Sequence, residues 1–247
     1  MIASNLANGM RAMPLLLYER LCIDDRRPSP YCWRARLALA HKGLAPEYCG
    51  VKFTEADKVG FSGQGKVPVL VDGEATVFDS WDIACYLEEA YPDAPSLFGG
   101  PGGRELARVL NHWTDKTLQA AFAPILAPSM LKVAYPDDRD YYRQTREPRY
   151  GCTLEALAAR RGEFRANLDR TLEPLRLRLA ESPYLSGEAP AYGDYLAFAE
   201  FQWARCADPE DLLSRDDKDR DLRAWRARML EAHNGLAMQV PAFSSAA

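Results

Sequence analysis

The apolar pattern of the chain changes once, at a proline- and glycine-rich segment with the sequence PDAPSLFGGPGG (residues 92–103). Before this segment, short apolar runs that suit strands alternate with stretches of helical spacing. After it, every patterned stretch is helical. Proline and glycine gathered in this way mark a connection between structural units. We therefore expect an α/β domain (residues 14–92) followed by an all-α domain (residues 104–235).

The first domain is predicted to mix strands and helices. Compact or alternating apolar runs predict four strands, at residues 15–18, 48–53, 67–71 and 75–78. Helical spacing predicts two helices, at residues 30–42 and 80–91. The stretch 54–65 has little apolar pattern, so we expect a mobile lid or an irregular loop there. The order β-α-β, then β-β-α, is that of a small thioredoxin-like domain.

The second domain is predicted to be a helical bundle. Five apolar residues follow one another at steps of four, four, three and four, which places them on one helical stripe: Phe164, Leu168, Leu172, Leu175 and Leu179. Residues 195–203 are almost entirely apolar, as expected of a central helix packed on all sides. A last helix is expected at residues 221–233, with Gly235 as its stop.

Composition argues against several classes of protein. The 247 residues include 31 Lys and Arg and 35 Asp and Glu, a net charge of −4, whereas nucleic acid and anionic membranes favour a basic surface. No apolar run approaches the roughly 18 residues that span a bilayer, and the first thirteen residues lack the apolar core of a secretory signal. The six cysteines form no C-x-x-C pair and only three histidines accompany them. We therefore expect a reduced, cytoplasmic protein without a metal site.

The first chemically informative motif is RPSPYC, residues 27–32, just before the first predicted helix. Serine is a preferred N-cap and proline a preferred first helical residue, so Ser29-Pro30 has a purely structural interpretation. The same geometry places the Ser29 hydroxyl beside unpaired amides and the positive end of the helix dipole. Helix N-termini lower the pKa of cysteine thiols in this way. Ser29 is therefore also a candidate to stabilise a bound thiolate.

The second motif is KVPVLV, residues 66–71. A proline costs a strand one ladder hydrogen bond, so Pro68 is expected at the beginning of its strand. Only a few per cent of X–Pro bonds are cis, and we therefore expect a trans bond between Val67 and Pro68. A cis bond would aim the N–H and C=O of Val67 outward like a free strand edge, on which a peptide pairs by β-augmentation.

The third motif is Asp79-Ser80, at the start of the second predicted helix. It has a structural interpretation as another N-cap. As a binding site, the Ser80 hydroxyl and the helix amides would hold a carboxylate, and Asp79 would meet an ammonium group. A peptide edge, an amino-acid clamp and a thiolate stabiliser together fit γ-Glu-Cys-Gly.

At these residues the sequence resembles the cytosolic glutathione transferases. The resemblance rests on SPYCWR (29–34), VP (67–68) and DS (79–80), with AYGD (191–194) in the second half. It implies an N-terminal thioredoxin-like domain that binds glutathione as co-substrate and a helical domain that holds a small apolar electrophile. It also implies a homodimer.

The resemblance assigns roles to individual residues. Ser29 would donate its hydroxyl to the glutathione sulfur, and Val67 with Pro68 would pair with the cysteinyl backbone. Asp79 and Ser80 would clamp the γ-glutamyl end, and Lys66 would reach the glycyl carboxylate. Four aromatic residues are candidates for the co-substrate pocket, although aromatic residues are more often part of a core: Tyr31, Trp113, Phe122 and Tyr135.

A narrower resemblance concerns residues 137–161, which are similar to an insertion of bacterial β-etherase-like members. The surroundings of the SPY motif are similar to fungal lignin-associated glutathione transferases. This resemblance implies cleavage of aryl ethers by glutathione attack on the ether carbon. A non-catalytic protein that binds glutathione or another ligand on the same scaffold is the alternative.

Two positions depart from what related chemistry would require. Ser29-Pro30-Tyr31-Cys32 resembles a glutaredoxin motif whose attacking cysteine is replaced, and a serine forms no mixed disulfide. We expect Cys32 to be a buried structural residue. The helical-domain motif of the family usually begins with Ser, Thr or Asn, but this chain has Ala191, which removes an N-cap side chain worth about 0.5–2 kcal/mol.

Overall fold

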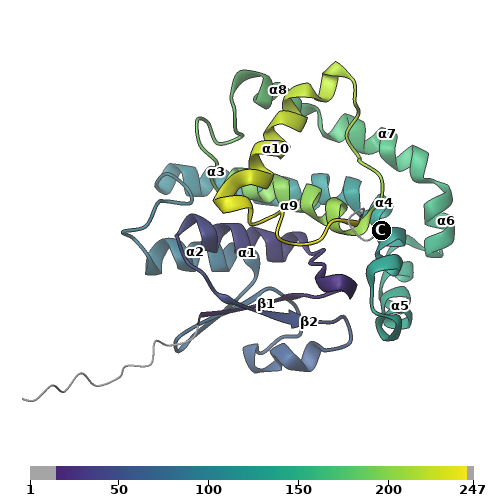
Figure 1. Ribbon diagram of the computed structural model, residues 1–247, viewed down its shortest axis with the longest axis horizontal. Helices are drawn as coiled ribbons and strands as arrows, with labels where there is room; N and C mark the ends of the chain where they lie inside the picture. The colour runs from purple at the N-terminus through teal and green to yellow at the C-terminus, as the bar shows by residue number, and fades with distance from the viewer. Residues whose placement is uncertain (1–14, 244–247) are drawn as a thin grey trace, which may run out of the picture.

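The computed structural model describes residues 15–243, which form a small sheet covered on one side by layers of helices. Figure 1 shows the sheet at one end of the molecule, α1 and α2 packed above it, and the remaining helices beyond them. The expected combination of an α/β part and a helical part is confirmed. Residue 14, the expected beginning of the first domain, lies outside the described residues.

The sheet has four strands in the order β2-β1-β3-β4. β1 pairs with β2 in parallel, and β3 pairs antiparallel with both β1 and β4. The strands span Leu15–Arg20 (β1), Glu47–Val51 (β2), Val69–Asp72 (β3) and Ala75–Phe78 (β4). All four predicted strands exist, and Asp72-Gly73 makes the turn between β3 and β4. β3 begins at Val69, so Pro68 precedes the strand and costs it no ladder bond.

Ten α-helices lie in the described part of the chain. The two predicted in the first part span Pro30–His41 (α1) and Ser80–Ala90 (α2). The others are α3 (Pro101–Trp113), α4 (Gln119–Val133), α5 (Arg139–Tyr150), α6 (Leu154–Ala159), α7 (Arg161–Thr171), α8 (Glu173–Glu181), α9 (Tyr192–Ala207) and α10 (Arg220–Gly235). A single π-helical turn, Thr114–Leu118, joins α3 to α4. α3 starts at Pro101, inside the segment expected to be a linker.

The predicted apolar stripe is divided between two helices. α7 and α8 meet at Leu172, and four members of the stripe are buried: Leu168, Leu172, Leu175 and Leu179. The predicted central helix is α9, whose residues 195–202 are all buried. α10 contains the expected last helix, with a kink at residues 232–234 before Gly235.

The stretch 54–65 is an irregular loop with a short 3₁₀ segment, Ala56–Ser62. Its beginning is held by the carboxylate of Asp138, which accepts hydrogen bonds from the Phe53 N–H (3.1 Å), the Thr54 N–H (3.0 Å) and the Thr54 hydroxyl (2.8 Å). Asp138 is completely buried. This anchor belongs to the segment 137–161, which lies against the sheet side of the molecule as α5 (Figure 1).

Asp194 compensates for the missing N-cap side chain at Ala191. Its buried carboxylate accepts hydrogen bonds from the N–H groups of Ala191 (3.2 Å), Leu185 (2.8 Å) and Ser186 (3.1 Å), and from the Trp225 indole (2.8 Å). The carboxylate therefore fixes the start of α9, the preceding loop and α10 at one point.

A buried ion-pair network joins α1 to the helical part. The Arg34 guanidinium is completely buried and donates to Glu200 of α9 (3.1 Å) and to Asp115 of the π-helical turn (2.6 Å). The second oxygen of Glu200 is buried without a hydrogen-bond partner in the described part of the chain. Burial therefore raises the pKa of Glu200 to about 7, although Arg34 opposes the shift.

Within residues 15–243, no helix is long and apolar enough to cross a bilayer. No group of three or more His, Cys, Asp or Glu side chains is placed there as a metal site would need. All six cysteines are free thiols.

Candidate glutathione site at the sheet edge

The register of the sheet brings the three predicted motifs to one edge. Tyr18 of β1, Val69 of β3 and Phe78 of β4 lie side by side across the three strands. Because β1 runs opposite to β3 and in the same direction as β4, the chain beyond Tyr18, the chain before Val69 and the chain after Phe78 meet at the same edge. These segments carry Ser29, Val67-Pro68 and Asp79-Ser80.

Ser29 is the N-cap of α1 and half-buried. Its hydroxyl oxygen accepts a hydrogen bond from the Cys32 N–H at 3.4 Å, as expected of a capping serine. A hydroxyl both accepts and donates, so the cap leaves the Ser29 proton available to a sulfur. In this structure Ser29 hydrogen-bonds the Cys32 thiol.

Cys32 is the buried cysteine that the sequence suggests. Only 1% of it is exposed, and burial raises the pKa of its thiol to about 11. It therefore stays a neutral thiol at physiological pH and is a poor nucleophile.

Val67 offers a free strand edge. The bond between Val67 and Pro68 is cis, so the expectation of a trans bond is wrong. Within residues 15–243 neither the N–H nor the C=O of Val67 has a hydrogen-bond partner. Next to it, the Gln64 amide brackets Lys66 by accepting from its N–H (2.6 Å) and donating to its C=O (2.8 Å). The Lys66 side chain is exposed.

Asp79 is the N-cap of α2, and its carboxylate accepts from the Trp81 N–H at 2.8 Å. Its φ of 70° lies in the left-handed region, which is strained for a residue with a side chain and is common at functional sites. Ser80 is buried, and its C=O accepts a hydrogen bond from the Tyr192 hydroxyl of α9 at 3.0 Å. α9 therefore holds the start of α2 in place.

The four aromatic candidates for a co-substrate pocket do not gather in one place. Tyr31 is half-buried and donates its hydroxyl to Gln119 at 2.8 Å, and Trp113 packs against the main core. The ring of Tyr135 lies under the Lys52 ammonium, 4.3 Å from it. For Phe122 the expectation is corrected, because its ring is completely buried and packs edge-to-face on Phe201, 5.1 Å between centroids.

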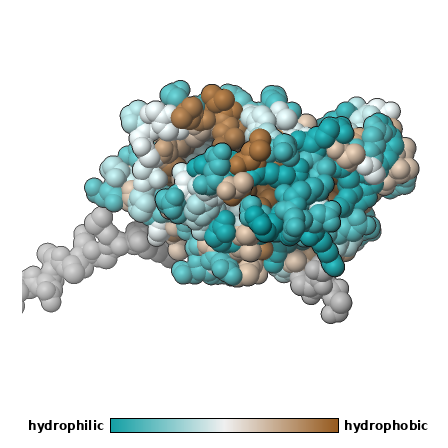
Figure 2. All heavy atoms as spheres, turned by 90° about the horizontal axis from the view of Figure 1, so that it is seen from above, coloured by the Kyte–Doolittle hydropathy of each residue, from teal (hydrophilic) through white to brown (hydrophobic). Residues whose placement is uncertain are grey.

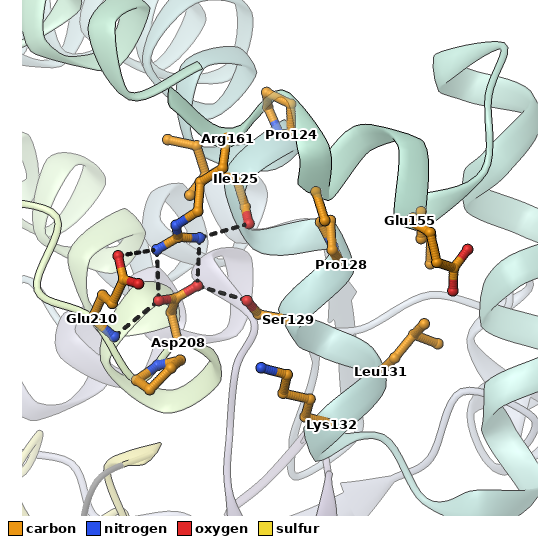
Figure 3. A pocket seen from close by; sticks show the side chains of 13 residues that line it. Pro124, Ile125, Pro128, Ser129, Leu131, Lys132, Glu155, Arg161, Asp208 and Glu210 are labelled. Atoms are coloured by element: carbon orange, nitrogen blue, oxygen red, sulfur yellow. Dashed lines mark hydrogen bonds and ion pairs between the residues drawn. The ribbon is translucent and has the colours of Figure 1, made fainter. Parts of the chain in front are cut away.

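A cavity of about 400 Å³ lies in the helical part, between α4, α6 and residues 208–210 (Figure 3). None of the predicted site residues lines it. Its polar wall is internally satisfied, since Asp208 accepts from Arg161 (2.8 Å) and from the Ser129 hydroxyl (2.6 Å). Figure 3 shows these groups pointing toward one another. This cavity therefore differs from the expected co-substrate pocket.

Sequence reasoning missed Asp138, Phe53 and Arg20, which lie at the carboxyl ends of β1 and β2 or against them. The adjacent aspartates at 137–138 have the pattern of a solvated charge pair, and no spacing connects them to residues 53–54. Only the fold brings the Asp138 carboxylate to those N–H groups.

Two family models match the chain. Residues 106–231, more than half of the chain, match the glutathione S-transferase C-terminal domain, and residues 28–90 match the N-terminal domain. Similar solved structures include glutathione transferase GSTFuA2 from Phanerochaete chrysosporium (TM-score 0.73, 24% identity, 92% of this chain and 95% of that chain). Beta-etherase LigF from Sphingobium sp. strain SYK-6 is also similar (TM-score 0.68, 19% identity, 92% and 99%). At these identities the likeness is one of fold.

Curated relatives match over shorter segments. Glutathione S-transferase Z1 of Arabidopsis thaliana is 42% identical over 84 residues, 32% of this chain and 38% of that protein. The glutathione S-transferase-like protein ustS of Aspergillus flavus is 27% identical over 147 residues, 54% and 52% respectively. The chain thus spans between about a third and a half of these relatives. Together with the family models and the fold, they show that this chain belongs to the glutathione S-transferase family.

Proposed function

We infer that this protein is a glutathione transferase that activates the glutathione thiol at Ser29 for attack on an electrophilic carbon of an apolar aromatic compound. The observation that carries this proposal is the Ser29 hydroxyl at the N-terminus of α1, on the same sheet edge as the unpaired backbone of Val67. A bound thiolate would meet the hydroxyl and the positive end of the helix dipole.

The remaining glutathione contacts follow from the same edge. The cysteinyl backbone pairs with Val67 beside Pro68, and the γ-glutamyl carboxylate lies at the start of α2 with Ser80, where helix amides favour an anion. Asp79 faces the ammonium group, and Lys66 reaches the glycyl carboxylate. We assign glutathione binding to residues 14–92 and the co-substrate to residues 104–235.

The protein supplies proximity and charge stabilisation in this mechanism, without a covalent enzyme intermediate. The glutathione thiol, whose free pKa is close to the roughly 8.5 of cysteine, loses its proton at the Ser29 site. Its sulfur then forms a bond to the electrophilic carbon, and the leaving group departs with the bonding electrons. Aryl-ether cleavage, in which the leaving group is a phenolate, is the finer form of this proposal.

Glutathione binding is tested by isothermal titration of the wild-type protein, and turnover by assay with chlorodinitrobenzene and a panel of aryl ethers. Ser80→Ala is expected to weaken glutathione binding about 5- to 30-fold, because one hydrogen bond to a carboxylate is lost. The matched control is Ser62→Ala, since the Ser62 hydroxyl donates to Val59 within the loop (2.7 Å). Binding without turnover on the whole panel would favour the non-catalytic protein, and absence of binding would refute the proposal.

We also propose that the protein is a homodimer through α3 and β4. Leu106 and Val109 are one turn apart on α3, with 73% and 66% of their surface exposed, and Phe78 of β4 is 45% exposed. Figure 2 shows apolar groups gathered toward one side of an otherwise mostly hydrophilic face. One exposed apolar patch on the helical part and another on the sheet suit a symmetric contact in which each meets the other's counterpart.

The double variant Leu106→Glu/Val109→Glu is expected to be a monomer, because two charges would be buried without partners at the interface. We expect association to weaken at least about 100-fold, as measured by light scattering after size exclusion. Leu177→Glu on α8 is the control, because Leu177 is 63% exposed and lies outside the proposed face. An unchanged dimer in the double variant would contradict this interface.

A further inference from the structure

Two arginines share one aromatic ring at the end of β2. The Arg20 guanidinium lies 4.4 Å from the centroid of the Phe53 ring, and the Arg146 guanidinium lies 5.9 Å from the same centroid. Arg146 of α5 also lies 5.0 Å from the centroid of Tyr142. Each contact is individually favourable, but together they hold two like charges close to each other.

Neither arginine has a carboxylate within ion-pair distance among residues 15–243. The three other arginines that are similarly enclosed in the helical part or at its border are paired, namely Arg34, Arg161 and Arg176. Burial by itself lowers the pKa of an arginine. In Arg161 the Asp208 carboxylate outweighs burial and raises the pKa, whereas in Arg20 burial prevails and the pKa is lowered.

The nearest buried carboxylate does not neutralise this pair. Asp138 is occupied by the N–H groups of Phe53 and Thr54 and by the Thr54 hydroxyl. Beyond it, Lys52 adds another positive charge, over the Tyr135 ring. The local balance among these four charged groups is therefore positive.

The two guanidinium groups still have N–H groups to offer. Arg20 donates one to the Val51 C=O (3.0 Å), and Arg146 donates one to the Thr145 hydroxyl (3.1 Å). Both side chains are half-buried, yet neither contributes an atom to the buried polar groups that lack a partner. Their remaining N–H groups therefore reach the surface, where an incoming acceptor meets them.

The pair lies next to the proposed thiolate position. Arg20 is the last residue of β1, on the edge that carries Ser29. Between them lies Cys32, whose thiol is hydrogen-bonded both by the Ser29 side chain and by the Arg20 backbone. An anion held by Arg20 and Arg146 is thus a near neighbour of a sulfur at Ser29.

We propose that Arg20 and Arg146 form an anion site for the co-substrate, and that this co-substrate is an aromatic carboxylate. The proposal rests on the proposed function, because it names the substrate class of the same site. A guanidinium fork matches a carboxylate with two parallel hydrogen bonds and its plane stacks on an aromatic ring, so the two arginines recognise both halves of such a molecule.

The test uses two unreactive probes that differ only in the carboxylate, 3,5-dinitrobenzoate and 1,3-dinitrobenzene. Binding to the wild-type protein saturated with S-methylglutathione is followed by quenching of protein fluorescence. We expect the benzoate to bind at least about 10-fold more tightly than the neutral probe, and Arg146→Gln to remove this preference while leaving the neutral probe unchanged. Arg149→Gln, exposed on the same helix, is the matched control and is expected to change neither affinity.

The outcomes separate this inference from the proposed function. Equal affinity of both probes in the wild-type protein, or the same loss in Arg149→Gln, would overturn the anion site. An effect of Arg146→Gln on glutathione affinity alone would assign the arginines to glutathione instead, and would also overturn it. If Arg146→Gln unfolds, loss of the benzoate preference of the wild-type protein at high salt provides the second readout. Turnover of neutral chlorodinitrobenzene reports on the proposed function independently of either probe.

Discussion

Replacing Ser29 by alanine is expected to lower kcat/KM for glutathione conjugation by about 100- to 1000-fold, the usual effect of removing one donor to an anionic centre. The physical reason is the lost hydrogen bond to the thiolate. We also expect the pKa of the bound thiol to rise by about 1 to 2, because a hydrogen bond to a charged group is worth about 1.5–3 kcal/mol. The pKa is measured from thiolate absorbance of the glutathione complex and from the pH–rate profile.

The capping role of Ser29 complicates this variant, since losing an N-cap costs about 0.5–2 kcal/mol of stability. Ser29→Gly is the control, because glycine caps nearly as well and has no hydroxyl. If the hydroxyl acts on the sulfur, Gly and Ala variants lose the same activity although they differ in stability. An unchanged pH–rate profile in both variants would remove Ser29 from the mechanism.

Sequence reasoning succeeded where a residue acts through its own backbone. Serine before proline predicts the start of α1, and Asp72-Gly73 predicts the β3–β4 turn. It was less successful with the stripe of apolar residues 164–179, because burial requires only that the residues share a face. The division between α7 and α8 had a signal in Pro174, which is well suited to the first turn of a new helix.

The site was only partly predictable for the same reason. Ser29, Val67 and Asp79 carry local signals, and the antiparallel register then brings them to one edge. The contacts of Asp138 and Arg146 depend on how α5 packs against the end of β2. Phe122 shows the opposite error, since an aromatic residue at helical spacing has the same pattern in a core as in a pocket.

The buried network between α1 and α9 provides the second large effect. Replacing Arg34 by methionine is expected to destabilise the protein by about 3–5 kcal/mol at pH 8, as breaking a buried ion pair does. Methionine has a similar length but leaves the completely buried Glu200 without its cation, and leaves Asp115 without its guanidinium partner. The free energy of unfolding is measured by denaturant titration.

The loss is expected to depend on pH, with a sign that Glu200 determines. The pKa of Glu200 in the folded protein is raised to about 7, above its ordinary value of 4.5. The folded state therefore keeps a proton that the unfolded state releases, so this group's contribution to stability falls as pH rises from about 4.5 through about 7. Without Arg34 the pKa of Glu200 rises further, and Arg34→Met should be closer to wild-type stability at pH 5.5 than at pH 8. The double variant Arg34→Met/Glu200→Gln is expected to remove this difference, whereas an equal loss at both pH values in Arg34→Met would show that Glu200 is not the group left uncompensated.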